Sequence, residues 1–141
     1  MDMKLIFAKR LFVFGLIIFV ISTVAIFSQT EFEKKRLEGK PAYDNGEKFL
    51  AERNYKSYLL SLEQFQLSAK IYGELPDLDD KYRVGRALLG VGLLKYYLSE
   101  TQGSIEAYNQ ALAIFRTFDD KKKWEGIALN RLGMMYEELG D

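Results

Sequence analysis

The sequence predicts an all-α protein, a stack of antiparallel helical hairpins preceded by one hydrophobic helix. The main observation is a repeat, in which a set of small and apolar residues recurs 41 residues later in the chain. The two sets are Gly85, Ala87, Leu88 and Gly92, and then Gly126, Ala128, Leu129 and Gly133. Self-similarity at this spacing is typical of stacked helical units. The chain also lacks alternating apolar runs bounded by turn residues, which argues against strands.

The segments next to the repeated sets also match each other. SIEAYNQALAIF (104–115) resembles SLEQFQLSAKIY (61–72), and Tyr108 and Ala111 share a helix face because they are three residues apart. Each leading helix carries an apolar stripe at helical spacing. The stripes are Leu88, Val91 and Leu94, and then Leu129, Leu132 and Tyr136. We therefore expect each leading helix to need a second helix to cover it.

Composition argues against an enzyme. The chain has 20 basic and 20 acidic residues, no histidine and no cysteine. Nucleophile–base pairs of the Ser–His or Cys–His kind cannot be built, and the commonest metal ligands are missing. We therefore expect no catalytic residues, no metal site, no cofactor and no small-molecule substrate. The balanced charge gives no reason to expect nucleic acid as a partner.

An apolar segment near the N-terminus predicts a membrane anchor or a signal peptide. Leu11–Thr30 carries no charge, and its apolar core, 11–27, is longer than a typical signal core of ~7–15 residues and shorter than a ~20-residue span. A signal peptide could be cut after Ala25 or near Ser28. The length of the run and its bulky end at Phe27 favour the uncleaved anchor. A buried helix is disfavoured because the run has no polar face.

The positive-inside rule does not select one orientation for this segment, because basic residues stand on both sides of it. They are Lys4, Lys9 and Arg10 before the run, and Lys34, Lys35, Arg36 and Lys40 after it. The N-terminal position favours export of the part that follows. We expect a single-pass membrane protein with an extracytoplasmic repeat domain, or a protein secreted after cleavage.

The chain divides into residues 1–29, the signal peptide or anchor; residues 30–40, a charged linker or solvated helical extension; and residues 41–141, the repeat domain. Pro41 suits the first turn of a helix. A first hairpin is expected over residues 42–72, with its turn near Asn54. A loop is expected over Gly73–Asp80, since Pro76 cannot sit in a helix interior and aspartates suit capping.

The rest of the domain is expected to form one and a half hairpins. The second hairpin is predicted over residues 81–118, with its turn at Ser99–Gly103. Asp119 and Asp120 suit the cap of a last helix that continues to Leu139.

These residues resemble the tetratricopeptide repeat, a helix–turn–helix unit with a Leu-Gly-x-x-Tyr pattern in its first helix and a small–aromatic–small pattern in its second. The patterns are matched by Leu132, Gly133 and Tyr136; by Val91, Gly92 and Lys95; by Ser104, Tyr108 and Ala111; and by Ser61, Phe65 and Ser68. Gly46 fits the first unit only with an insertion. The resemblance covers 42–141, about two and a half units, with a long period similar to that of kinesin light chains.

The resemblance implies a right-handed superhelical stack whose concave groove binds a protein or peptide. The groove residues it implies are Arg86, Leu89, Leu93, Tyr96, Tyr97, Ile127, Asn130, Met134, Glu137 and Glu138. An asparagine at 130 suits hydrogen bonds to a ligand's backbone. Members that clamp a terminal carboxylate carry an asparagine where this chain has Leu93 and Met134, so that mode is disfavoured.

Three other patterns have ordinary structural explanations. Gly90-Val91-Gly92 lacks the features of a phosphate-binding loop and indicates a pair of helix-packing glycines. The aspartates at 77, 79 and 80 lack calcium-loop spacing and indicate a solvated, capping loop. The lysines of 121–123 indicate an exposed helix start with Trp124 turned inward.

The chain stops where the family's next helix would begin. The last helix is therefore expected to leave five side chains partly uncovered: Leu129, Leu132, Met135, Tyr136 and Leu139. We expect a truncated product or the front of a longer array. The function expected is a membrane-anchored or exported interaction scaffold. The alternatives are the targeting or regulatory part of a larger signalling or hydrolytic protein, with its catalytic module beyond residue 141, and a purely structural anchor.

Overall fold

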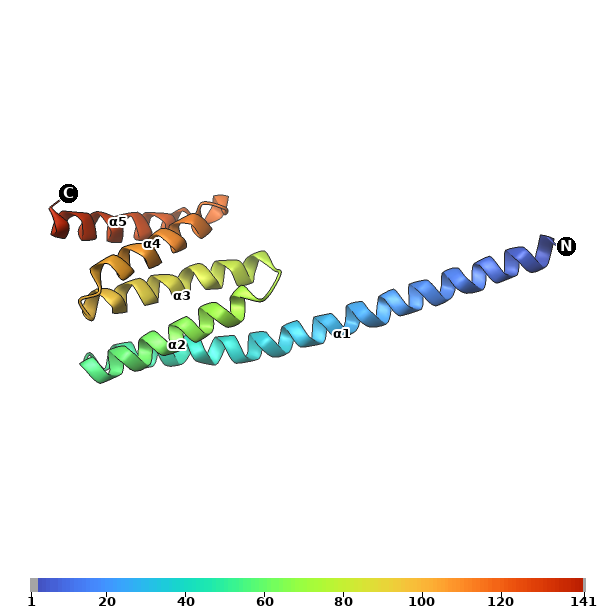
Figure 1. Ribbon diagram of the computed structural model, residues 1–141, viewed down its shortest axis with the longest axis horizontal. Coiled ribbons are helices and arrows are strands. Elements are labelled where there is room, and N and C mark those ends of the chain that lie inside the picture. The colour runs from blue at the N-terminus through green and yellow to red at the C-terminus, as the bar shows by residue number, and fades with distance from the viewer. Residues whose placement is uncertain (1–2, 141) are drawn as a thin grey trace. The chain divides into compact units, whose positions relative to one another are not determined.

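The computed structural model describes residues 3–140, with side chains from Val13 to Gly140 (Figure 1). The elements are α1 (Met3–Ala51), α2 (Tyr55–Gly73), α3 (Leu78–Tyr97), α4 (Thr101–Phe115), the short 3₁₀ helix η1 (Asp119–Lys121) and α5 (Lys122–Leu139). Residues 3–140 contain no strand, and successive helices pack on one another, which confirms the predicted fold class. The chain forms two compact units, residues 1–34 and 35–141.

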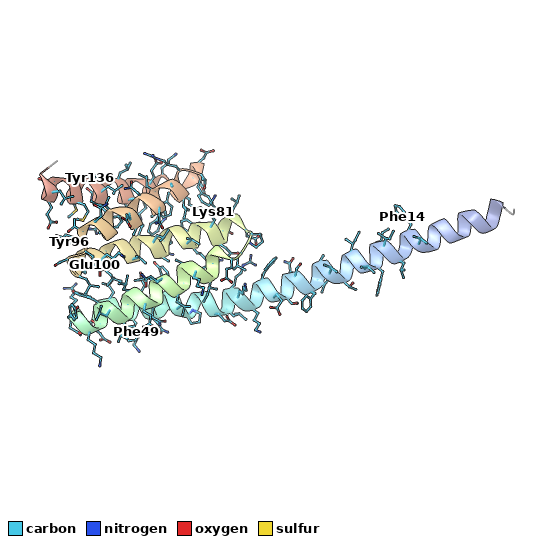
Figure 2. The ribbon with its side chains drawn as sticks, in the orientation of Figure 1. Phe14, Phe49, Lys81, Tyr96, Glu100 and Tyr136 are labelled. Atoms are coloured by element: carbon cyan, nitrogen blue, oxygen red, sulfur yellow. The ribbon has the colours of Figure 1, made fainter. Side chains whose placement is uncertain are left out.

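The first unit is the part of α1 that ends at Lys34. Its apolar side chains from Val13 to Phe27 are exposed, among them Phe14, which is labelled in Figure 2. The helix is long and apolar enough to cross a membrane, with a mean hydropathy of 2.1 in its most apolar stretch, and a signal sequence has the same properties. The predicted apolar run also includes Leu11 and Phe12, whose side chains lie outside the part that the structure describes.

Hydroxyl groups in this unit bond back to their own helix. The Ser22 Oγ donates to the carbonyl of Ile18 at 2.8 Å, and the Thr23 Oγ1 donates to that of Val20 at 2.9 Å. Ser28 and Thr30 make similar bonds. The polar groups of the apolar stretch are thus satisfied without water.

Residues 30–40 are helical, so this segment is an extension of the helix rather than an irregular linker. The prediction that Pro41 lies in the first turn of a helix is wrong, because Pro41 lies inside α1. Proline there lacks the N–H that would bond to the carbonyl of Leu37. Packing of the neighbouring Gly39, Ala42 and Gly46, all buried, offsets that loss.

The end of α1 and α2 form the first antiparallel hairpin, which is held at two glycines of α1. The carbonyls of these glycines accept hydrogen bonds from serine hydroxyls of α2: Ser61 to Gly46 at 2.6 Å and Ser68 to Gly39 at 3.1 Å. Two rings of α2 lie over the same glycines, and a Cβ there would be 3.0 Å from them: Phe65 over Gly46 and Tyr72 over Gly39. Glycine therefore suits this close approach, since a methyl group at either position would press on the ring above it.

The second hairpin, α3 with α4, repeats this arrangement. The two glycines of its leading helix, Gly85 and Gly92, stand 46 residues after Gly39 and Gly46. The Ser104 hydroxyl donates to the Gly92 carbonyl at 2.7 Å. A Cβ at Gly92 would lie 2.6 Å from the ring of Tyr108, and one at Gly85 would lie 2.9 Å from that of Phe115. The two hairpins thus share these contacts, except that Ala111 stands where the first hairpin has Ser68 and makes no hydroxyl bond to Gly85.

The turns are equivalent as well. Arg53 and Ser99, each two residues beyond the end of the leading helix, have left-handed backbones with φ of 53° and 62°, and Gly140, directly after α5, has φ of 80°. Asn54 then caps α2 in a reciprocal pair with Ser57. The predicted turn near Asn54 is confirmed. The turn predicted at 99–103 lies at residues 98–100 instead, because Thr101–Gly103 already belong to α4.

The third leading helix, α5, packs on α4. Leu132 and Met135 are buried against Ile105, Leu112 and Phe115. The expectation that Leu132 and Met135 are uncovered is therefore wrong, because α4 already covers them. The expectation holds for the other three: Leu129 is 45% exposed, Tyr136 40% and Leu139 53%.

An ion cluster joins Arg36, in the interior of α1, to the first turn of α3. Asp80, expected in a solvated loop, is fully buried in the first turn of α3, and the loop is shorter, at residues 74–77. The Arg36 side chain donates to its carboxylate from Nε at 2.9 Å and from Nη2 at 2.7 Å, and also reaches Asp77. Arg83 donates to the second oxygen at 2.7 Å.

The predicted caps of the last helix are not found. Asp119 and Asp120 form the 3₁₀ turn η1, and Lys121 stands at the start of α5 without a side-chain capping bond. Because Asp119 and Asp120 lie within this tighter turn, they do not cap α5.

Candidate functional site

The leading helices of the repeat, α1, α3 and α5, line one pocket of about 210 Å³. Its residues are Tyr43, Glu47 and Leu50 of α1; Arg86, Leu89, Gly90 and Leu93 of α3; and Trp124, Ile127 and Arg131 of α5, with Phe65 and Tyr108 of the second helices. Residues of a leading helix that point away from its own hairpin partner fall on one surface when hairpins stack. The pocket is therefore a product of the repeat.

Arg86 lies between two aromatic rings. Its guanidinium carbon is 4.8 Å from the centre of the Tyr43 ring and 5.0 Å from that of Trp124. Its Nη2 donates to the Tyr43 hydroxyl at 2.9 Å, whereas its Nε is buried with no hydrogen-bond partner. These two cation–π contacts hold the guanidinium in the wall of the pocket.

Tyr43 connects Arg86 to a carboxylate. Burial raises the pKa of the Tyr43 phenol to about 12. The phenol therefore keeps the proton that it donates to Glu47 at 3.1 Å while it accepts from Arg86. Its ring meets Phe65 edge-on, with centres 5.2 Å apart. The result is a rigid polar chain of Arg86, Tyr43 and Glu47 along one side of the pocket.

Gly90 makes room for the floor of the pocket. A Cβ at this position would lie 2.7 Å from the Phe65 ring. The prediction that Gly90 and Gly92 are helix-packing glycines is confirmed, since they contact Phe65 and Tyr108 from the interior of α3.

The structure brings together four of the ten residues implied for the groove: Arg86, Leu89, Leu93 and Ile127. Asn130, Met134, Glu137 and Glu138 are exposed on α5 and do not line the pocket. Tyr97 instead stacks on Tyr58 of α2, with ring centres 5.0 Å apart. Tyr96, labelled in Figure 2, packs against the cluster of α4 and α5.

Sequence reasoning missed the pocket residues of α1 and two of α5. Tyr43 and Glu47 stand 46 residues before Leu89 and Leu93, so they occupy in α1 the places that these leucines occupy in α3. A search at that spacing would have found them. Trp124 was expected to turn inward, which it does, packing on Phe115 with ring centres 6.1 Å apart as well as on Arg86.

A second hollow of about 290 Å³ lies between α2, α3 and α4. Its lining has no aromatic ring, and its lysine, Lys95, is already paired with Glu100 at 3.2 Å. Pockets that recognise ligands combine apolar walls with a few fixed polar groups. The pocket at Arg86 has this combination, so it is the candidate site.

Among the described residues, no group of three or more Asp or Glu side chains could hold a metal ion. The aspartates near residue 80 are instead engaged by Arg36 and Arg83.

No family model, no curated protein and no solved structure matches this chain.

Proposed function

We propose that this chain is a membrane-tethered interaction protein whose tetratricopeptide-like hairpins bind a segment of a partner protein at the Arg86 pocket. The observation that carries the proposal is that the successive leading helices of the repeat, α1, α3 and α5, all contribute side chains to the lining of one pocket. A surface assembled by the repeat itself is the usual binding face of a helical array.

The size of the pocket favours one side chain of a peptide over a small-molecule ligand. Pockets for drug-sized ligands are ~300–1,000 Å³, and this one is about 210 Å³. Leu50, Leu89 and Leu93 offer apolar contact for that side chain. Arg131, at the α5 side, can donate to a backbone carbonyl beside it.

The N-terminal part of α1 supplies the tether. Its apolar stretch has exposed side chains from Val13 to Phe27, and its hydroxyls are satisfied by carbonyls one turn back. A helix in lipid must satisfy its polar groups internally, and this one does. We place the hairpin domain on the extracytoplasmic side, because the segment is N-terminal and preceded by basic residues.

Peptide selection with matched variants tests the pocket. Random peptides displayed on phage are selected on the full chain in neutral detergent and then tested on Leu93→Glu and on Leu59→Glu. Leu93 lines the pocket, whereas Leu59 is a half-exposed leucine on α2. We expect selected peptides to bind Leu59→Glu normally and Leu93→Glu at least about tenfold more weakly, since an unpaired carboxylate disfavours apolar contact. Equal binding by both variants would refute the proposal.

The tether is tested by sequencing the mature N-terminus of the protein in membrane and soluble fractions. The proposal expects an uncleaved chain that stays with membranes after alkaline extraction. A new N-terminus after Ala25 or Ser28 in a soluble exported fraction would replace the anchor by a signal peptide.

A further inference from the structure

Two tyrosines from neighbouring hairpins are stacked at the surface of the domain. Tyr58 of α2 and Tyr97 of α3 have ring centres 5.0 Å apart and ring planes inclined by 25°. Tyr96 and Tyr97 form a second pair, but their ring centres are 5.9 Å apart and their planes are tilted by 44°. The stack of Tyr58 and Tyr97 therefore brings ring carbons from two different helices into contact.

The packing of the domain leaves the hydroxyls of this pair unused. Tyr97 is 46% exposed, and Tyr58 is partly exposed beside it. Neither hydroxyl bonds to another residue in the part of the chain that the structure describes, whereas the Tyr43 hydroxyl bonds to both Glu47 and Arg86. Two phenylalanines would stack equally well, so the phenol groups are open to chemistry from the solvent.

The pair lies at the open end of α2 and α3. These helices are joined at their other end by the loop 74–77, and the start of α2 and the end of α3 lie at the same end of the hairpin domain (Figure 1). Tyr58 is in the first turn of α2, and Tyr97 is the last residue of α3. A bond between the two rings would close residues 58–97 into a loop and tie the first hairpin to the second.

Tyrosine is the side chain through which oxidation can cross-link these helices. The chain has nine tyrosines and no cysteine, so no disulfide can join them. A tyrosine that loses one electron and its hydroxyl proton becomes a phenoxyl radical, in which the ring carbons beside the hydroxyl share the unpaired electron. Two such radicals in contact couple through these carbons.

We propose that Tyr58 and Tyr97 are a site of oxidative cross-linking, at which a peroxidase-type oxidant using hydrogen peroxide joins the two rings as dityrosine and so ties the hairpins together. The oxidant takes the first electron from the more exposed Tyr97, and the hydroxyl proton passes to water. Electron transfer through the stack moves the radical to Tyr58, so that Tyr97 can be oxidised a second time.

The reaction balances in atoms and electrons. A carbon–carbon bond forms between the positions beside the two hydroxyls, and the hydrogen on each of these carbons moves to the oxygen as the ring regains its aromaticity. The protein loses two electrons and two protons in all, and hydrogen peroxide takes them up to become two molecules of water. Tyr97 is half-exposed at the end of its helix, so its ring can turn into the bonding orientation.

Oxidation of the full chain and of matched variants tests the site. The chain is diluted in neutral detergent to disfavour bonds between chains and treated with a peroxidase and hydrogen peroxide, and dityrosine fluorescence is measured on the monomer band. Tyr58→Phe and Tyr97→Phe keep the stacked ring and remove the hydroxyl, so both variants are expected to fold. Tyr55→Phe is the control, because Tyr55 is 69% exposed on the same helix as Tyr58.

We expect Tyr55→Phe to yield as much dityrosine in the monomer as the wild type. Tyr58→Phe and Tyr97→Phe should each yield at least about tenfold less, because rings held in contact couple far faster than separated ones. Mass spectrometry of the digested monomer should find the peptide that contains Tyr58 joined to the one that contains Tyr97, with a loss of two hydrogen atoms.

The cross-link should also change the stability of the domain. It should raise the midpoint of thermal unfolding by about 5 °C or more, since a closed loop lowers the entropy of the unfolded chain. Tyr97→Phe treated with the same oxidant should show no such rise, which controls for oxidation of methionine or tryptophan.

Four results would overturn the inference: no dityrosine in the monomer, equal yields in the wild type and Tyr97→Phe, a bond from Tyr97 to Tyr96 in place of Tyr58, or a cross-linked monomer with an unchanged unfolding midpoint. The inference does not rest on the Arg86 pocket, because none of the three variants alters a residue of its lining. Failure of one proposal is therefore distinguishable from failure of the other.

Discussion

Asp80 holds a charge at a position with no solvent exposure, in the first turn of α3. Arg36 and Arg83 both donate to its carboxylate, so each oxygen is satisfied. Such a pair adds little net stability when complete, because both charges lose their hydration. Removal of one partner is costly, since the other is left without compensation.

We predict that Asp80→Ala lowers the free energy of unfolding by about 3–5 kcal/mol, because Arg36 loses its main partner. Asp79→Ala is the matched control, as Asp79 is exposed in the same helical turn and should change stability by less than about 1 kcal/mol. Urea unfolding followed by circular dichroism at 222 nm measures both. Equal losses for the two variants would contradict the role given to Asp80.

At the scale of the element, glycine has opposite effects on stability in α3 and in α5. Gly92 lies under Tyr108, which is almost fully buried and cannot move aside cheaply. Gly133 has open space above it. Glycine inside a helix costs about 0.5–1 kcal/mol relative to alanine, and at Gly133 no contact within the described residues returns that cost.

Gly92→Ala is expected to destabilise the domain by about 1–2 kcal/mol, since overpacking outweighs the gain in helix propensity. Gly133→Ala is expected to stabilise it by about 0.5–1 kcal/mol. Thermal or urea denaturation of the two variants beside the wild type gives the comparison. A loss of stability in Gly133→Ala would mean that the space above Gly133 is filled in the isolated protein.

The repeat in the sequence was sufficient to predict the helices from Tyr55 to Leu139 and the packing role of Gly92. It did not predict the packing role of Gly39, and it placed Gly46 only with an insertion, because the leading helices are offset by 46 residues whereas the second helices are offset by 43. The burial of Asp80 could not be predicted, since its partner Arg36 is 44 residues away in sequence. The pocket was predicted only in part: Leu89 and Leu93 follow from the family resemblance, but the first leading helix matches the family pattern too poorly to place Tyr43.

At the scale of the whole molecule, the two units set the boundary of the folded domain at Lys35. This boundary lies before Pro41, where the domain was expected to begin. The intervening residues include Arg36, which binds Asp80, and Gly39, whose carbonyl accepts from Ser68. These residues belong to the packing of the domain even though their sequence is mostly charged.

A chain that begins at Lys35 should fold with the same secondary structure and the same unfolding midpoint as the full chain in detergent. A chain that begins at Pro41 should be less stable by about 3 kcal/mol or more, because it loses the partner of Asp80 and the contact of Gly39 with Tyr72. Circular dichroism and urea titration of the two shortened chains test this. Equal stability would place the domain boundary at Pro41.

The equivalence of the two hairpins has a consequence for how the chain folds. By side-chain pattern alone, α4 could cover Gly46 of α1 as well as it covers Gly92 of α3, and α2 could cover α3. The connections of three residues, Glu52–Asn54 and Leu98–Glu100, decide between these pairings, because the shortest loops close first at the lowest entropic cost. A longer linker at either turn would therefore slow refolding and let helices exchange partners between neighbouring chains.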